Sequence, residues 1–152
     1  MKNKKNFGKL YEDFQVSDVI EHWPGKTITE SDNNLFCLLT MNHHPVHLDI
    51  HFAKESKHKK ILVNGLLVIS LVVGLTVREV SGKAIANLGY SNITHHAPTF
   101  INDTVYCVSK VISKINKTKN GIVKISTNAY NQKKKLILSL ERTILVPKKK
   151  YA

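Results

Sequence analysis

The chain has 152 residues, 42% hydrophobic and 22% charged, which is the length and composition of one ordinary folded domain. Its 23 lysines and arginines outnumber 11 aspartates and glutamates, and the net charge of +12 favours either high solubility or an anionic partner such as a phosphorylated small molecule. The lysine clusters contain almost no aromatic residues on which bases could stack, so a nucleic-acid-binding role is not expected.

Both ends of the chain are basic. We expect one domain over residues 1–152, with residues 1–8 and 148–152 as flexible tails. No apolar stretch follows the first lysines, so this segment does not resemble a secretory signal, and a cytoplasmic location is expected by default. Cys37 and Cys107 lack the spacing of a zinc site and are expected to be buried, reduced thiols.

The first third of the chain predicts one short strand and two helices. Residues 18–23 have strand character, and Pro24-Gly25 predicts a turn. Thr29, with an acid three residues later, predicts the start of a helix that runs to about residue 41. The helix should end before Pro45, because a residue that precedes proline is disfavoured in the helical region. A second short helix is expected over residues 47–53.

Residues 61–77, ILVNGLLVISLVVGLTV, form an almost uncharged segment. It is shorter than the roughly 20 residues that span a membrane, and it contains polar residues and glycines. A helix that is apolar on all sides can form the buried centre of a folded domain. We therefore expect a central helix that begins near Gly65, and no membrane partner.

The second half of the chain predicts a sheet. Four segments rich in β-branched residues, at 83–94, 103–116, 121–132 and 135–146, are separated by short polar or proline-containing stretches. Successive strands of this kind form an antiparallel sheet. The expected fold class is α+β, a curved antiparallel sheet wrapped around the central apolar helix.

The stretch TMNHHPVHLD, residues 40–49, is the main candidate for chemistry. A metal site could use His44, His47 and His51, but Pro45 interrupts the helix that would align them, and the spacing matches no common zinc motif. No bound metal is therefore expected. A second histidine pair, His95-His96, is interpreted as exposed loop residues.

An acid–base site fits this stretch better. The turn delivers His47 to the start of a short helix, where Asn42 and Asp49 are close enough in sequence to orient it. Histidine can accept and return a proton near neutral pH. Asn64-Gly65 opens the apolar helix, whose free N–H groups can bind a developing oxyanion, although helix–sheet packing alone would also account for Gly65.

These residues resemble the MaoC-like dehydratase family, which includes (R)-specific enoyl-CoA hydratases and has the signature Asp-x-Asn-Pro-(Leu/Ile)-His-x-Asp. The matching frame here is residues 42–49, and Ala53 also corresponds. The resemblance extends through GKLYEDFQVSDVI, TITESDNNLF, ILVNGLLVISLVVGL, ANLGY, HAPTFINDTV, AYNQ and RTILV. It implies a hot-dog fold, in which a curved sheet surrounds a central helix.

The resemblance also implies roles for individual residues. His47 falls on the catalytic histidine, and Gly65 on the glycine whose N–H holds the thioester oxygen. Asn42 stands in place of the catalytic aspartate, His44 replaces the asparagine of the signature, and Asn64 stands where many relatives have a histidine. Because an amide cannot accept a proton, His47 would be the only general base and Asn42 would orient water or substrate.

The expected activity is that of a hydro-lyase that reversibly adds water to an α,β-unsaturated acyl-CoA thioester. Asn42 makes the chain similar to the mesaconyl-CoA and methylmalyl-CoA branch, since a substrate with its own carboxylate would repel a second acid. The resemblance implies a homodimer and no metal, nicotinamide or flavin, with coenzyme A present as part of the substrate. A thioesterase that uses Asp49, or a non-catalytic acyl-CoA-binding protein, remain alternatives.

Overall fold

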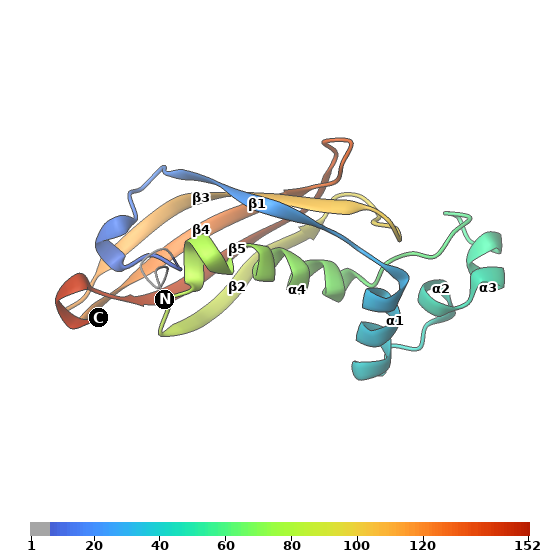
Figure 1. Cartoon of the computed structure of the whole chain (residues 1–152), viewed down its shortest axis with the longest axis horizontal. Coiled ribbons are helices and arrows are strands. Elements are labelled where there is room, and N and C mark those ends of the chain that lie inside the picture. The colour runs from blue at the N-terminus through green and yellow to red at the C-terminus, as the bar shows by residue number, and fades with distance from the viewer. Residues whose placement is uncertain (1–6) are drawn as a thin grey trace.

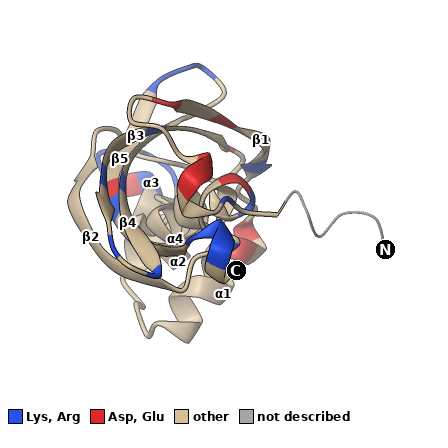
Figure 2. Cartoon of the chain, turned by 90° about the vertical axis from the view of Figure 1, so that its left-hand side faces the viewer, with Lys and Arg blue, Asp and Glu red and all other residues tan. Residues whose placement is uncertain are grey.

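The computed structural model describes residues 7–152. A five-stranded antiparallel sheet, in the order β1-β3-β4-β5-β2, curves around one side of helix α4 (Figures 1 and 2). Helices α1, α2 and α3 form a group beyond one end of the sheet, close to the start of α4 (Figure 1). In chain order the elements are η2 (Tyr11–Asp13), β1 (Val19–Thr27), α1 (Glu30–Leu39), α2 (Pro45–Leu48), α3 (Ile50–Glu55), α4 (Gly65–Leu75), the π-helical turn η3 (Val77–Ser81), β2 (Ala86–His95), β3 (Thr104–Asn116), β4 (Asn120–Tyr130), β5 (Leu136–Pro147) and η4 (Lys149–Tyr151).

The α+β class and the curved antiparallel sheet are confirmed. All four predicted strands of the second half are present, with boundaries within a few residues of those expected. Every second residue of β4 is buried, which places one face of the strand in the core. The buried residues of that face pack with Val68 and Val72 of α4 or, toward the other end of the sheet, with Phe14 and Val80.

The predicted turn at Pro24-Gly25 is wrong. Strand β1 continues through it, with an irregular register against β3 between His22 and Lys26. Proline lacks a backbone N–H, but β1 is an edge strand of the sheet, so Pro24 interrupts the ladder at little cost. A bulge then absorbs the extra residues.

The first helix begins as predicted, whereas the second differs. Thr29 caps α1, since its Oγ1 accepts a hydrogen bond from Asp32 N and Asp32 Oδ2 accepts one from Thr29 N. The helix expected over residues 47–53 is two helices, α2 and α3, separated at Asp49. This residue has extended backbone angles, and its side chain accepts a hydrogen bond from Phe52 N at 3.0 Å. Asp49 is therefore the N-cap of α3, and the chain forms a second helix after it.

Helix α4 begins at Gly65, as predicted, and the sheet curves around one of its sides. Val68 and Val72 are buried, while Leu66 is 59% exposed. The sheet thus wraps around the helix as predicted, and most apolar residues of α4 are buried or partly buried, while Leu66 at its start is left exposed. Within the same part of the chain, no helix has both the length and the apolar character needed to cross a membrane.

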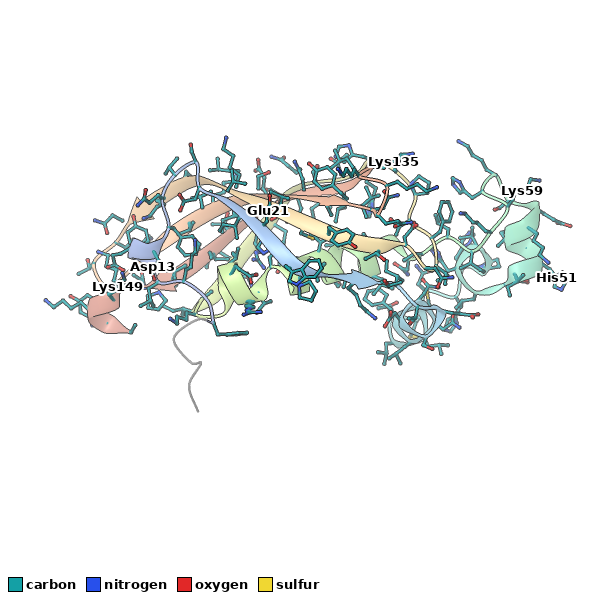
Figure 3. All side chains as sticks on the ribbon, turned by 45° about the horizontal axis from the view of Figure 1, so that its top comes forward. Asp13, Glu21, His51, Lys59, Lys135 and Lys149 are labelled. Carbon is teal, nitrogen blue, oxygen red and sulfur yellow. The ribbon has the colours of Figure 1, made fainter. Side chains whose placement is uncertain are left out.

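The expected C-terminal tail is packed against the domain. In η4, Lys149 Nζ lies 2.6 Å from Asp13 Oδ1, and Lys149 N donates to Glu12 Oε2, so the tail joins η2 at one end of the sheet (Figure 3). Of the N-terminal tail, residues 1–6 lie outside the described residues, and Gly8 N donates to Arg78 O at 2.6 Å. Both cysteines are free and buried, as predicted.

Candidate active site

A cavity of about 330 Å³ opens beside the start of α4. It joins residues from α2, from the segment before α4 and from the end of β2, which are far apart in sequence. Its lining contains four histidines and no aspartate or glutamate. The lining residues are His47, His58, Leu62, Val63, Gly65, Val68, His95, His96, Ala97, Pro98 and Thr99.

His47 is held by the main chain. Its Nδ1 lies 2.6 Å from the carbonyl oxygen of Leu62. A carbonyl oxygen can only accept a hydrogen bond, so Nδ1 must carry the hydrogen of the neutral imidazole. The lone pair then resides on Nε2, the nitrogen that a general base needs.

The carbonyl that orients His47 is itself fixed. Leu62 forms an antiparallel bridge with Phe100, and Val63 N donates to Thr99 O at 2.9 Å. Leu62 N also donates to Val46 O, which ties the segment to α2. These bonds fix the Leu62 carbonyl, which accepts the hydrogen bond from His47, between residues 99–100 and α2.

Gly65 provides the first backbone N–H of α4. The neighbouring N–H of Leu66 donates to the cap Asn64 Oδ1 at 3.0 Å, whereas the N–H of Gly65 has no acceptor in the described chain. A Cβ atom at residue 65 would lie 3.0 Å from His95 Nε2, so glycine permits this imidazole to approach the helix. The cavity thus brings together an imidazole nitrogen that can accept a proton and a backbone N–H that can donate a hydrogen bond to a ligand oxygen.

The side chain of Asn33, in α1, connects the two halves of the site. It is fully buried, donates from Nδ2 to His47 O at 2.9 Å and accepts from Asn64 N at 2.9 Å. One amide therefore sets the position of α2 relative to α4. Sequence reasoning missed Asn33, because an asparagine inside a helical segment gives no local sign of partners 14 and 31 residues away.

The expectation for His95-His96 is incomplete. Both side chains are exposed, but His95 is the last residue of β2 rather than a loop residue, and both line the cavity. His96 Nε2 lies 2.8 Å from Ser139 Oγ. Partial desolvation of the ring at the cavity wall, and to a lesser degree the neighbouring His96, lower the pKa of His95. Their position could not be read from the sequence, because it depends on the pairing of β2 with β5.

The other predicted site residues lie outside the cavity lining. Asn42 is half-buried in the turn before α2, where its Oδ1 accepts from His44 N at 3.3 Å. Asn64 is 2% exposed; beside its cap bond, it donates from Nδ2 to Cys37 Sγ. Asp49 caps α3. These three side chains accept hydrogen bonds from backbone N–H groups close in sequence to His47 and Gly65.

The histidines considered for a metal have other contacts. His44 Nδ1 accepts from Val46 N at 3.2 Å, so it caps α2, and His47 Nδ1 is occupied by Leu62 O. His51 is on the outer side of α3 (Figure 3). Within residues 7–152, no group of three or more His, Cys, Asp or Glu side chains is placed to hold a metal ion.

Comparisons with known proteins identify the family and the fold. The family model "MaoC like domain" matches residues 13–133. The chain is 34% identical over 151 residues to the beta-methylmalyl-CoA dehydratase of Chloroflexus aurantiacus, covering 98% of this chain and 43% of that protein.

Two solved structures share the fold. A MaoC domain protein dehydratase from Chloroflexus aurantiacus superposes with a TM-score of 0.91 at 32% identity, over 97% of this chain and 43% of that one. A Mycobacterium tuberculosis protein described as a double hot-dog fold superposes with a TM-score of 0.85 at 20% identity, over 93% and 44% of the two chains. The chain thus spans less than half the length of these relatives. It has a hot-dog fold and belongs to the MaoC-like domain family.

Proposed function

We propose that the protein is an acyl-CoA hydratase or dehydratase, which reversibly adds water across the α,β double bond of an enoyl-CoA thioester. The observation that carries the proposal is the 2.6 Å contact of His47 Nδ1 with Leu62 O, which leaves Nε2 as the basic nitrogen in a cavity also lined by Gly65. The relative from Chloroflexus aurantiacus, a beta-methylmalyl-CoA dehydratase by name, supports the same class of reaction.

In the hydration direction, Nε2 of His47 takes a proton from water while the water oxygen forms a bond to the β-carbon. The π electrons of the double bond move to the thioester oxygen, and the N–H of Gly65 stabilises the resulting enolate. The imidazolium then returns its proton to the α-carbon, and the enolate electrons form that C–H bond. Dehydration is the reverse sequence. The reaction needs no cofactor, because coenzyme A enters as part of the substrate.

In this mechanism, His47 is the only general base. Asn42 is assigned the orientation of water or substrate, since its amide can hydrogen-bond but cannot accept a proton at neutral pH. Its Oδ1 accepts from His44 N and it lies outside the cavity lining, so in this role the side chain would have to turn from that bond toward His47. Asn64 would act by holding the first turn of α4, and with it Gly65.

The proposed substrate carries a second carboxylate on its acyl group, as mesaconyl-CoA does. The cavity has four histidines and no acidic side chain in its lining, so a carboxylate meets hydrogen-bond donors there and no like charge. His95, next to Gly65, is the histidine best placed to contact it.

We also propose a homodimer. Strand β2 is an edge strand with nine of its ten residues exposed, among them the apolar side chains of Leu88, Tyr90 and Ile93. An unpaired edge and an exposed apolar surface favour a second copy of the module. The cytoplasm, where acyl-CoA esters are available, is the proposed location.

The test is a set of enoyl-CoA and hydroxyacyl-CoA esters, followed at the absorbance of the conjugated thioester. The parent should interconvert an enoyl-CoA and its hydroxy product, and His47→Ala should lower kcat about 10²- to 10⁴-fold. His51→Ala, which removes an exposed histidine outside the cavity, is the matched control and should retain activity.

The same assay distinguishes the alternatives. Release of free thiol from acyl-CoA would show a thioesterase; Asp49 would have to give up its capping bond to Phe52 N to activate water for that reaction. Binding of acyl-CoA without turnover in the parent would show a non-catalytic binding protein. Either outcome would contradict the proposal.

A further inference from the structure

A second, basic cavity adjoins the first. It has a volume of about 430 Å³ and is lined by three lysines, Lys60, Lys133 and Lys135, together with residues of the loop before β3. Pro98 lines both cavities. The two cavities therefore border on the same residue.

The three lysines come from two distant segments of the chain. Lys60 precedes α4, while Lys133 and Lys135 belong to the turn between β4 and β5. Figure 3 shows Lys135 in the same half of the molecule as Lys59, the neighbour of Lys60, and Lys59 lies nearer the end. Among the residues that the structure describes, none of the three forms a salt bridge. Their charges are available to a ligand.

The walls of this cavity are built by side-chain hydrogen bonds. Asp103, its only acidic lining residue, accepts from Phe100 N and from Gln132 Nε2, both at 2.8 Å. Gln132 Oε1 in turn accepts from Thr104 N at 3.0 Å. These bonds clamp the loop before β3 to the β4–β5 turn. They also engage both carboxylate oxygens of Asp103.

The lysines themselves are positioned by short-range contacts. Lys60 Nζ lies 3.8 Å from the centre of the Phe100 ring, a cation–π contact at the cavity wall. Asn131 Oδ1 accepts from the backbone N–H groups of both Lys133 and Lys135, which fixes the turn that carries them. A third cavity, of about 300 Å³, shares Lys60 and Phe100 with this one and adds Lys54 and Lys59.

We propose that the basic cavity binds the phosphate groups of the adenosine nucleotide of coenzyme A, with Lys60, Lys133 and Lys135 as their ligands. The inference rests on the proposed function, since the uncharged pantetheine arm separates the reacting thioester from these phosphates. A hollow lined by ammonium groups and by the amides of Asn102, Asn131 and Gln132 suits a small polar anion. It therefore favours coenzyme A esters over esters of an acidic carrier protein, which would require a broad contact surface.

The experiment compares coenzyme A and pantetheine thioesters of the same acyl group. Replacing Lys60, Lys133 and Lys135 together by Gln should raise KM for the coenzyme A ester at least about tenfold at low salt, with kcat unchanged. It should leave KM for the pantetheine ester, which lacks the nucleotide, unchanged. The control replaces Lys110, Lys117 and Lys119 by Gln, three exposed lysines of β3 and the turn after it, and removes the same charge from outside the cavity.

Calorimetric titration with free coenzyme A separates this inference from the proposed function. If the parent binds coenzyme A and the cavity variant binds it at least about tenfold more weakly, the phosphate site holds even for a parent that hydrates no ester. Equal loss in the control variant would assign the effect to overall charge and overturn the site. So would an unchanged affinity in the cavity variant, or a parent that accepts an acyl carrier protein ester but no coenzyme A ester.

Discussion

Asn33 Oδ1 accepts the backbone N–H of Asn64 at 2.9 Å, so a side chain of α1 determines where α4 begins. The same amide holds the carbonyl of His47. Asn33→Ala should lower the free energy of unfolding by about 1–3 kcal/mol, because it leaves the buried N–H of Asn64 and the partly buried carbonyl of His47 without this partner. It should also lower kcat, since Gly65 and His47 would no longer be aligned.

Urea unfolding and the hydratase assay measure these two effects. Asn34→Ala is the matched control, since the half-buried neighbouring asparagine makes no side-chain hydrogen bond to the described residues. Equal effects of the two substitutions would contradict the assigned role of Asn33.

Gly65→Ala should impair catalysis without unfolding the protein. The added Cβ would lie 3.0 Å from His95 Nε2 and displace that ring, so kcat/KM should fall about tenfold or more. Gly74→Ala is the counterpart in the same helix. Its Cβ would meet no atom within 4 Å, so it should raise stability by about 0.5–1 kcal/mol and leave kcat/KM unchanged. Steady-state kinetics and thermal unfolding of both variants check the prediction.

Asn42→Asp should discriminate between substrate classes. If residue 42 contacts the substrate as proposed, a carboxylate there should repel a dicarboxylic acyl group, so kcat/KM for mesaconyl-CoA should fall relative to that for crotonyl-CoA. A parallel change for both substrates would show that residue 42 does not sense the charge of the acyl group.

The capping carboxylate of Asp32 should contribute to stability in a defined pH range. A hydrogen bond from Lys26, and next the bond from Thr29 N, lower the pKa of Asp32 from 3.8 to about 2. Its folded pKa is thus below its unfolded value, so the contribution is complete above pH ~4 and is lost as the pH falls toward 2.

Asp32→Asn should consequently destabilise the protein at pH 7 and much less near pH 2. Because the ion pair is partly exposed, with a side-chain accessibility of 33% for Asp32, water screens it and the difference should be at most about 1 kcal/mol. Denaturant unfolding of both proteins between pH 2 and 7 measures it. A difference that stays constant over this range would show that the charge is irrelevant.

The buried thiols should be inert in the folded protein. Burial raises the pKa of Cys107 to about 12, so almost no thiolate forms at pH 8. A thiol-reactive reagent should label neither cysteine in the native state and both in guanidinium chloride, as judged by mass spectrometry. Rapid native labelling at Cys107 would contradict the burial of this strand.

The features predicted from the sequence are those determined by neighbouring residues. The Thr29–Asp32 cap acts over three residues, and the alternation in β4 repeats every second residue, so both can be read locally. Pro24 looked like a turn because its tolerance depends on β1 being an edge strand, which only the assembled sheet decides. Asn33 and His95 were not recognised for the same reason: each meets its partner across the fold.

The resemblance located His47 and Gly65, but the hydrogen-bond geometry of the site required the structure. The acceptor for His47 is a backbone oxygen, which every residue has, so the type of residue 62 could not predict this hydrogen bond. Asn64 was predicted as part of the substrate-binding site and Asp49 as a residue that could orient His47; the side chains of both cap helices.

The partner of His47 has a further consequence for how the site can change. Catalytic imidazoles that depend on a carboxylate can be disabled by one substitution of that acid, whereas every amino acid at position 62 supplies the same carbonyl oxygen. The imidazole is thus protected against point mutation of its support. Displacement of the bridge between Leu62 and Phe100 would move that carbonyl, so the path of the backbone, and not the type of residue 62, positions the imidazole.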